Sequence, residues 1–389
     1  MSADLKNQSP ASRSAFSLIL PVALGSLVGI FGLQFILSMD SKPQAFDELA
    51  LGSQTTICWS EIESNPIHCG MRDNTFQACV NAYKRNGRNR DVVLWLGNSQ
   101  LHAINQFSKG DKNASFYLHQ LLSDKNRYLF TISIPNANLQ EHLFLAEYAW
   151  HHLPVKTIVL PLVFDDTRES GVREDLHVAI KLPAVKNRIA QTDIGQKLIQ
   201  QCEASIVCED SLQPQEKTLQ QYSEDFLSGK LARHSKIWSS RPDLRGKFFV
   251  SLYRLRNYLL GIDASSKRRI IRGSYIANLE ALKALVDSAR QSDIEVLTYI
   301  APIRDDVPIP YDQNEYSGFK QETRSITRKA GGTFFNLEQL VPNENWGTKE
   351  STRIAGAPEI DFMHFQAEGH VRLANAIDEG LRTIWSNSY

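Results

Sequence analysis

Short apolar runs alternate with amphipathic segments along most of this 389-residue chain, and this alternation constrains the fold more than any other feature. The clearest run, VVLWL at residues 92–96, is typical of a buried strand. Further strands are predicted at 128–134, 155–164, 294–301 and 333–336. Strands that alternate with helices form a parallel sheet covered on both sides. The sequence therefore predicts an α/β protein, a three-layer α/β/α sandwich around a parallel sheet.

Helical spacing of apolar residues fills the gaps between these strands. Between about residues 167 and 272 the alternation stops, and helical patterns alone predict a helical insertion. Asn138 is the predicted N-cap of the helix after the second strand. The predicted helices are 114–123, the segment after Asn138, 187–203, 215–232, 242–261, 275–291, 315–329 and a terminal helix that begins near Gln366.

An uncharged stretch runs from Ala15 to Leu37 near the start of the chain. A helix of this length can cross a bilayer core of roughly 30 Å, whereas a cleaved signal peptide has a shorter apolar core of about 7–15 residues. Lys6 and Arg13 precede the stretch and Asp40 follows it. By the positive-inside rule, we expect a single uncleaved transmembrane helix with the main domain outside the cytoplasm, in the periplasm or at the cell surface.

Four regions follow from these patterns. They are a cytoplasmic segment 1–14, an anchor 15–37, an extracytoplasmic lead-in 38–88, and an α/β domain 89–389 that carries the insertion. Basic and acidic residues balance at 43 each, so the net charge does not indicate a nucleic-acid partner. No metal-ligand spacing is present, and we expect neither a metal nor a cofactor.

The five cysteines are predicted to be structural, in an oxidising compartment. Cys202 and Cys208 are close enough in sequence for a local disulfide. Cys58–Cys69 is a second expected pair, which leaves Cys79 over.

Ser99 comes just after the predicted strand of residues 92–96 and opens a short helical segment. In a parallel α/β sheet, ligands bind at the carboxyl ends of the strands. A serine there is a candidate nucleophile, since the N–H groups of a helix N-terminus favour developing negative charge. The alternative is that Ser99, or Asn98 before it, only caps the helix.

Asp361 and His364 lie three residues apart, ahead of the terminal helix. Within one turn this spacing brings a carboxylate to imidazole Nδ1 and leaves Nε2 free to act as a base. The alternative is a capping aspartate and a surface histidine. Together with Ser99, the pair completes the parts of a Ser-His-Asp triad.

"WLGNSQLH" followed far downstream by "DFMHFQAEGHVRLANAI" resembles the SGNH/GDSL hydrolase superfamily. Gly97-Asn98-Ser99 matches its Gly-Asp-Ser block and Asp361-Phe362-Met363-His364 its Asp-x-x-His block, over residues 90–165 and 275–385. The resemblance implies a three-layer fold and acyl-ester chemistry. In layout, the chain is similar to membrane-anchored envelope members of the O-acyltransferase type, such as the D-alanyl-lipoteichoic acid transfer protein and the alginate O-acetylation proteins.

Two family blocks do not match residue for residue. Asn98 stands where the superfamily has aspartate. The glycine and the Gly-x-Asn-Asp block that contribute to the superfamily's oxyanion hole are absent from this sequence. The Ser99 backbone N–H remains as one donor. Asn136 or Asn138 is a candidate second donor, with turn formation and helix capping as the alternatives.

Further polar residues are predicted at the same edge of the sheet. Asp165, Asp166 and Arg168 follow the third strand and would bind a polar acceptor such as a sugar, or form an internal ion pair. His102, one helical turn after Ser99, is expected to pack or to contact substrate, since no carboxylate lies beside it in sequence to make it the base.

These observations and the resemblance predict a membrane-anchored, extracytoplasmic serine acyltransferase or esterase that acts on O-acyl groups of an envelope polysaccharide or polymer. A membrane-bound O-acyltransferase is the partner that the resemblance implies. The alternative is a non-catalytic SGNH-like binding or assembly subunit of such a complex.

Overall fold

The computed structural model describes residues 54–71, 74–123, 125–211, 255–351 and 357–386, with the backbone alone for 206–211. The expected anchor at 15–37, the segment 1–14, the first part of the lead-in and most of the helical patterns at 215–232 and 242–261 lie outside these residues. Within them, no helix is both long and apolar enough to cross a membrane.

The strands and helices follow the alternation that the sequence predicted. The strands are β1 (Thr55–Ile57), β2 (Glu61–Ile62), β3 (Asn65–Pro66), β4 (His68–Cys69), β5 (Asp91–Gly97), β6 (Ala103–Asn105), β7 (Arg127–Ser133), β8 (Val155–Leu162), β9 (Glu295–Ile300), β10 (Thr333–Asn336), β11 (Trp346–Lys349) and β12 (Glu359–Phe365). The α-helices are α3 (Thr75–Asn86), α4 (Ser99–His102), α5 (Ala114–Ser123), α6 (Leu139–His152), α7 (Pro183–Ile189), α8 (Asp193–Ser211), α12 (Arg272–Gln291), α13 (Gln313–Lys329) and α14 (Ala367–Ser386). The 3₁₀ helices are η1 (Asp165–Arg168), η2 (Glu174–Lys181) and η3 (Asn343–Asn345).

Six strands form one sheet in the order β10-β9-β8-β5-β7-β4, and every neighbouring pair is parallel. The chain passes from β5 to β7 on one side and then returns to β8 on the other side of β5. This reversal makes the carboxyl end of β5 the switch point of the sheet, where open α/β sheets form their binding crevice. Ser99 lies two residues beyond that end.

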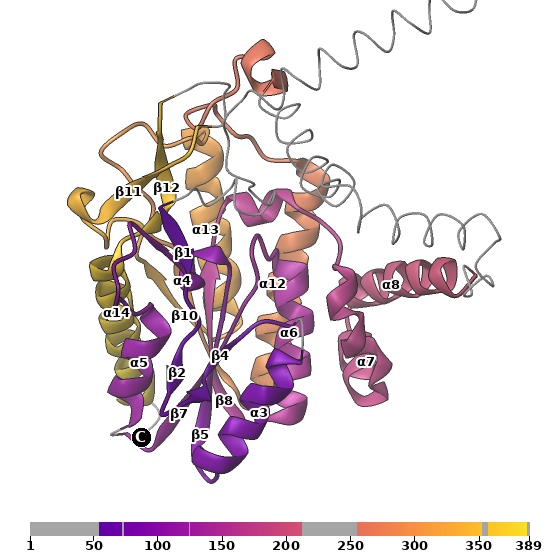
Figure 1. Cartoon of the computed structure of the whole chain (residues 1–389). Helices are drawn as coiled ribbons and strands as arrows, with labels where there is room; N and C mark the ends of the chain where they lie inside the picture. The colour runs from indigo at the N-terminus through magenta and orange to yellow at the C-terminus, as the bar shows by residue number, and fades with distance from the viewer. Residues whose placement is uncertain (1–53, 72–73, 124, 212–254, 352–356, 387–389) are drawn as a thin grey trace, which may run out of the picture.

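Two separate cores cover the faces of the sheet (Figure 1). In β5, Val92, Leu94 and Leu96 face one core, and Val93 and Trp95 face the other. Helices α5 and α14 pack on the Trp95 side, while α3, α6, α12 and α13 pack on the opposite side. The predicted parallel sheet, with helices on both faces, is therefore present.

The lead-in is part of this sheet. Strand β4 pairs with the edge of β7, and β1 pairs antiparallel with β6 beyond α4. Strand β4 has only two residues, which are too few for a strand to be predicted from the sequence. The described part of the expected insertion is helical, with η2, α7 and α8.

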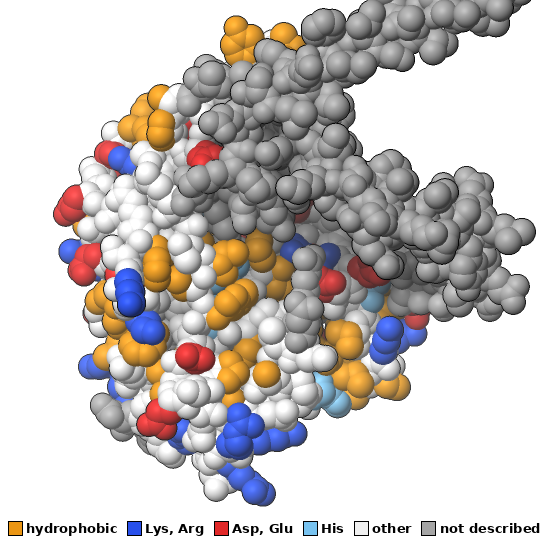
Figure 2. Space-filling model, in the orientation of Figure 1, with side chains coloured by type: hydrophobic (Ala, Val, Ile, Leu, Met, Phe, Trp, Pro, Cys, Tyr) orange, Lys and Arg blue, Asp and Glu red, His pale blue; other side chains and the backbone are white. Residues whose placement is uncertain are grey.

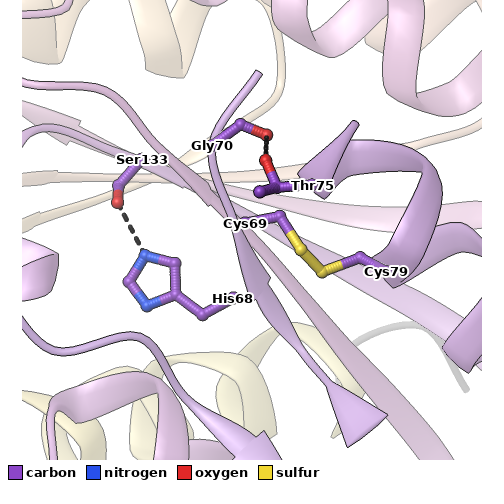
Figure 3. The surroundings of a disulfide bond; sticks show 6 residues. All are labelled: His68, Cys69, Gly70, Thr75, Cys79 and Ser133. Atoms are coloured by element: carbon purple, nitrogen blue, oxygen red, sulfur yellow. Dashed lines mark hydrogen bonds between the residues drawn. A yellow bond between two sulfur atoms is a disulfide. The ribbon is translucent and has the colours of Figure 1, made fainter. Parts of the chain in front are cut away.

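The predicted cysteine pairing is wrong. Cys69 in β4 bonds to Cys79 in α3 (Figure 3). Cys58 is a free, partly exposed thiol. Cys202 is also free and buried. It lies with Cys208 on α8, where six residues rise about 9 Å, beyond the Cα separation of about 7 Å that a disulfide tolerates.

Basic and acidic side chains are interspersed over the visible face of the molecule (Figure 2). This mixture agrees with the equal totals of the two charge types in the sequence. It gives that face no single-sign character of the kind that steers nucleic acids.

Removal of the Cys69–Cys79 disulfide, in a Cys69→Ala/Cys79→Ala variant, is expected to lower the free energy of unfolding by about 2–3 kcal/mol, because a closed loop of this size restricts the unfolded chain. Denaturant titration of the full-length protein checks this, with Cys58→Ser as the control. Equal loss in the control, or none in the double variant, would contradict the prediction.

His142 in α6 is 1% exposed, and neither ring nitrogen has a hydrogen-bond partner among the described residues. Burial, with a smaller contribution from Arg173, lowers the pKa of His142 from 6.5 to about 3. The folded protein therefore keeps His142 neutral, while the unfolded chain protonates below pH 6.5. This histidine stabilises the fold fully above pH 6.5, and the contribution is lost as pH falls toward 3.

Between pH 7 and pH 5, His142→Leu is expected to lose about 2 kcal/mol less unfolding free energy than the wild type, because leucine cannot take up a proton. Denaturant titrations at the two pH values provide the test. An equal loss in both proteins would show that His142 does not contribute to acid unfolding.

Candidate active site

The apolar side chains of strand β5 are buried on both faces, which fixes the strand in the sheet. Ser99 therefore lies at the edge of the sheet, just beyond the carboxyl end of β5. A Cβ at Gly97 would lie 2.2 Å from Leu101 Cδ1, so any larger residue there would force the Leu101 side chain to move. Helix α4 is a single turn, and Asn98 is its cap, with Oδ1 accepting the Gln100 N–H at 3.0 Å. Asn98 thus provides the cap, and the Ser99 side chain is left for other contacts.

Ser99 Oγ lies 2.9 Å from His364 Nε2, and His364 Nδ1 lies 2.9 Å from Asp361 Oδ2. Ser99 is partly exposed, whereas His364 and Asp361 are buried. The three predicted residues form one hydrogen-bonded chain that ends at an accessible hydroxyl. A serine, a base and an orienting carboxylate in this order are the parts of nucleophilic acyl transfer.

The local structure of the Asp-x-x-His segment differs from the prediction. It lies in strand β12, which pairs antiparallel with β11, and not in a helical turn. The contact still forms because Asp361 Oδ1 accepts the backbone N–H groups of Met363 and His364 at 2.9 and 3.0 Å. These bonds bend the carboxylate back toward the imidazole.

Burial alone would raise the pKa of Asp361, but the charge of His364 and the hydrogen bonds from His364 and Met363 outweigh it and leave the pKa below its usual value. Asn105 Nδ2 also donates to Asp361 Oδ2, at 3.2 Å. Asp361 is therefore an anion that fixes the Nδ1–H tautomer of His364. Sequence reasoning missed Asn105, which carries no motif signal.

Gln100 holds the two halves of the site together. Its Nε2 donates to the carbonyls of Pro302 (2.9 Å) and Met363 (2.8 Å). The amide therefore ties α4 to the loop after β9 and to β12. This brace sets the distance between Ser99 and His364.

Asn98 and Asp166 form a buried pair beside Ser99. Asn98 Nδ2 donates to Asp166 Oδ2 at 2.8 Å. Burial is the main cause that raises the pKa of Asp166 well above 3.8, and the negative charges of Asp165 and Glu141 add to it. Opposing contributions come from the Asn98 hydrogen bond and from Arg173.

Of the two alternatives for Asp165 and Arg168, the structure contains the internal ion pair. Asp165 Oδ2 accepts from Arg268 Nη1 and from Tyr311 Oη, and Arg168 Nη1 lies 3.7 Å from Asp165 Oδ1. Arg168 Nε donates to the Arg269 carbonyl. These contacts join η1 to the segment before α12.

Asn138 has the capping role, the alternative to an oxyanion donor. Its Oδ1 accepts the Glu141 N–H at 3.0 Å in a capping box, and its Nδ2 donates to the Gly171 carbonyl. Asn136 is exposed and takes φ 53°, the turn conformation expected as its alternative. Neither asparagine is placed by its contacts as an oxyanion donor.

His102 is fully buried and stacks on Trp59, with ring centroids 5.2 Å apart. Its Nδ1 lies 2.7 Å from Ser133 Oγ, which is also 2.6 Å from His68 Nε2 (Figure 3). Burial lowers the pKa of His102 to about 3 and that of His68 well below 6.5. Both rings are therefore neutral, and the packing role expected for His102 is the one observed.

The proton positions in this network follow from Asn113. Its Oδ1 accepts the Phe116 N–H, so Nδ2 donates to His68 Nδ1 at 3.1 Å. His68 must then donate from Nε2 to Ser133, and Ser133 donates to His102 Nδ1. His68 and Ser133 come from β4 and β7, and only the folded sheet brings them together.

A pocket of about 740 Å³ opens at this edge of the sheet. Ser133 and Ile134 line it, and the Ile134 N–H donates to the carbonyl of Gly97, which ends β5. Trp59, half exposed, lies on its wall with polar residues that include Asn136 and Arg173. The pocket thus adjoins the end of β5 through the Ile134–Gly97 hydrogen bond, and Ser99 and His364 are not among its lining residues.

Among the described residues, no group of three or more histidine, cysteine, aspartate or glutamate side chains is arranged to hold a metal ion.

No protein-family model matches the chain, and neither does any curated protein. Among solved structures, the chain is similar to a "putative acylhydrolase" from Bacteroides fragilis (9% identity, TM-score 0.35, covering 78% of this chain and 95% of that chain). It is also similar to an acetylxylan esterase, Axe2, from Geobacillus stearothermophilus (9% identity, TM-score 0.34, 74% and 92%). Similarities at this identity and TM-score support no conclusion about function.

Proposed function

We propose that this protein is a serine acyltransferase or esterase in which Ser99 is the nucleophile, His364 the base and Asp361 the orienting carboxylate. The observation that carries the proposal is the chain of two 2.9 Å contacts from Asp361 through His364 to a partly exposed Ser99 hydroxyl. The position at the switch point of a parallel sheet supports it further.

The reaction has two halves. Ser99 Oγ attacks the acyl carbonyl while His364 Nε2 takes its proton, and His364 then gives that proton to the leaving alcohol. The acyl-enzyme is resolved by an acceptor hydroxyl in transfer or by water in hydrolysis, with His364 again as the base.

The acceptor that we propose is an envelope polysaccharide or polymer, with a membrane-bound O-acyltransferase as partner. The support for this substrate class is the layout that the sequence shares with membrane-anchored envelope members of the superfamily: an N-terminal apolar stretch, an SGNH-like domain and a helical insertion. The 740 Å³ pocket, with Trp59 and polar groups on its wall, lies at the same edge of the sheet and has room for a bulky polar acceptor.

A fluorophosphonate probe is expected to label Ser99 of the full-length protein and to leave Ser99→Ala unlabelled, as read by mass spectrometry of the modified peptide. Ser133→Ala is the matched control, because Ser133 also contacts imidazole but is buried and has no carboxylate behind it. Labelling of Ser99→Ala would overturn the assignment.

Asp361→Asn is expected to slow labelling about 10⁴-fold, because the amide cannot hold the productive tautomer of His364. A protein that is never labelled, and whose Ser99→Ala variant keeps full function in cells, would support the alternative of a non-catalytic assembly subunit.

We also propose that the chain is anchored in a membrane by residues 15–37, with the α/β domain outside the cytoplasm. The uncharged run with basic residues before it supports this orientation. The Cys69–Cys79 disulfide supports an oxidising compartment.

Alkaline carbonate extraction of cell membranes is expected to leave the full chain in the pellet and to release a variant that lacks residues 1–38. The uncharged stretch is the only part removed that could hold a bilayer. Release of the full chain would contradict the proposed anchor.

A further inference from the structure

The transition state of acyl transfer needs hydrogen-bond donors for the negative charge on the former carbonyl oxygen. Most polar side chains around Ser99 already make hydrogen bonds to other groups of the protein. Gln100 donates to two backbone carbonyls, and Asn138 caps α6. His102 retains an unpartnered Nε2, but no part of that residue is exposed.

Asp166 is the exception. It follows β8, the strand next to β5, and its Oδ2 accepts from the Asn98 amide, which is folded over the start of α4. The Asn98 contact is the one hydrogen bond of the Asp166 carboxyl group among the described residues, so its other oxygen, Oδ1, has no partner there, and the residue is 7% exposed. One carboxyl oxygen is therefore left free at the turn that carries Ser99.

We propose that Asp166, as a neutral carboxylic acid, donates a hydrogen bond from Oδ1 to the oxyanion that forms when Ser99 attacks an acyl carbonyl. This inference rests on the proposed function. A neutral carboxyl group has nearly the shape of a side-chain amide and supplies one O–H donor. The Ser99 backbone N–H supplies a second donor.

The surroundings of Asp166 favour the neutral form. The charged groups that face it are Asp165, Glu141 and Arg173, and the two carboxylates oppose ionisation. Arg173 is already held by Glu141, with Nε–Oε1 and Nη2–Oε2 distances of 2.6 and 2.8 Å. An ionised Asp166 would repel the oxyanion. Burial keeps the Asp166 carboxyl group neutral and so allows it to donate a hydrogen bond to the oxyanion.

The chemical step is balanced without a proton from Asp166. The Ser99 Oγ–carbon bond forms, the π pair of the carbonyl moves to its oxygen, and the hydroxyl proton goes to His364 Nε2. When the tetrahedral intermediate collapses, the carbonyl re-forms, the alcohol leaves, and it takes the proton from His364. Asp166 keeps its proton throughout and only shares it in a hydrogen bond.

The test is the rate at which an alkyl fluorophosphonate labels Ser99 of the full-length protein, followed as a function of pH. The phosphoryl oxygen of the probe takes the place of the oxyanion, and fluoride leaves. Because burial raises the pKa of Asp166, the donor is lost only as the pH rises through that raised pKa, and wild-type labelling is expected to decline on its alkaline side.

Three variants separate the outcomes. Asp166→Leu removes the donor and is expected to label about 10²–10³-fold more slowly. Asp166→Asn keeps a donor that cannot ionise, and is expected to label at about the wild-type rate without the alkaline decline. Asp165→Asn, the neighbour with its own ion pair, is expected to keep that decline.

Labelling of Asp166→Leu within about threefold of the wild type would overturn the inference. So would an alkaline decline that persists in Asp166→Asn, a variant that decides the matter even if the leucine protein does not fold. Failure of the proposed triad would give a different result, because the probe would then still label the Ser99→Ala variant.

Discussion

The hydrogen bond between Ser99 and His364 joins positions 265 residues apart, and most of the structure serves to hold it. Strand β5, buried on both faces, fixes where Ser99 leaves the sheet, and β12 returns His364 to the same edge. Gln100 locks the two together through backbone carbonyls on either side of the site. A shift of either segment would separate nucleophile and base, although both residues would remain in place along the chain.

Beneath this contact lies a layer of neutral polar groups. His68, Ser133 and His102 form a directed hydrogen-bond chain in which burial keeps both imidazoles uncharged. Their neutrality matters because a positive charge close to His364 would disfavour protonation of His364, whereas the Asp361 carboxylate favours it. Of the acidic residues at this site, Asp361 is held as an anion, whereas the surroundings of Asp166 favour the neutral acid.

Local chemistry explains which sequence predictions held and which were wrong. The parallel sheet, the N-cap at Asn138 and the meeting of Ser99, Asp361 and His364 agree with the sequence reasoning. Asn138 caps α6 through Oδ1, and its Nδ2, the group that an oxyanion would need, donates to the Gly171 carbonyl instead. The cysteine pairing failed because proximity in sequence says little about which strand and helix will lie side by side.

The sequence by itself determined the alternation of strands and helices and the residue types of the triad, since both depend on local periodicity and on side-chain chemistry. Only the tertiary structure decided which cysteines meet, that the Asp-x-x-His segment is a strand, and that β4 completes the sheet. It alone also brought Asn105 and His68 to the site, and it decided that Asp166 pairs with Asn98. These contacts join distant segments, and their formation depends on the order of strands and on burial, which no short stretch of sequence encodes.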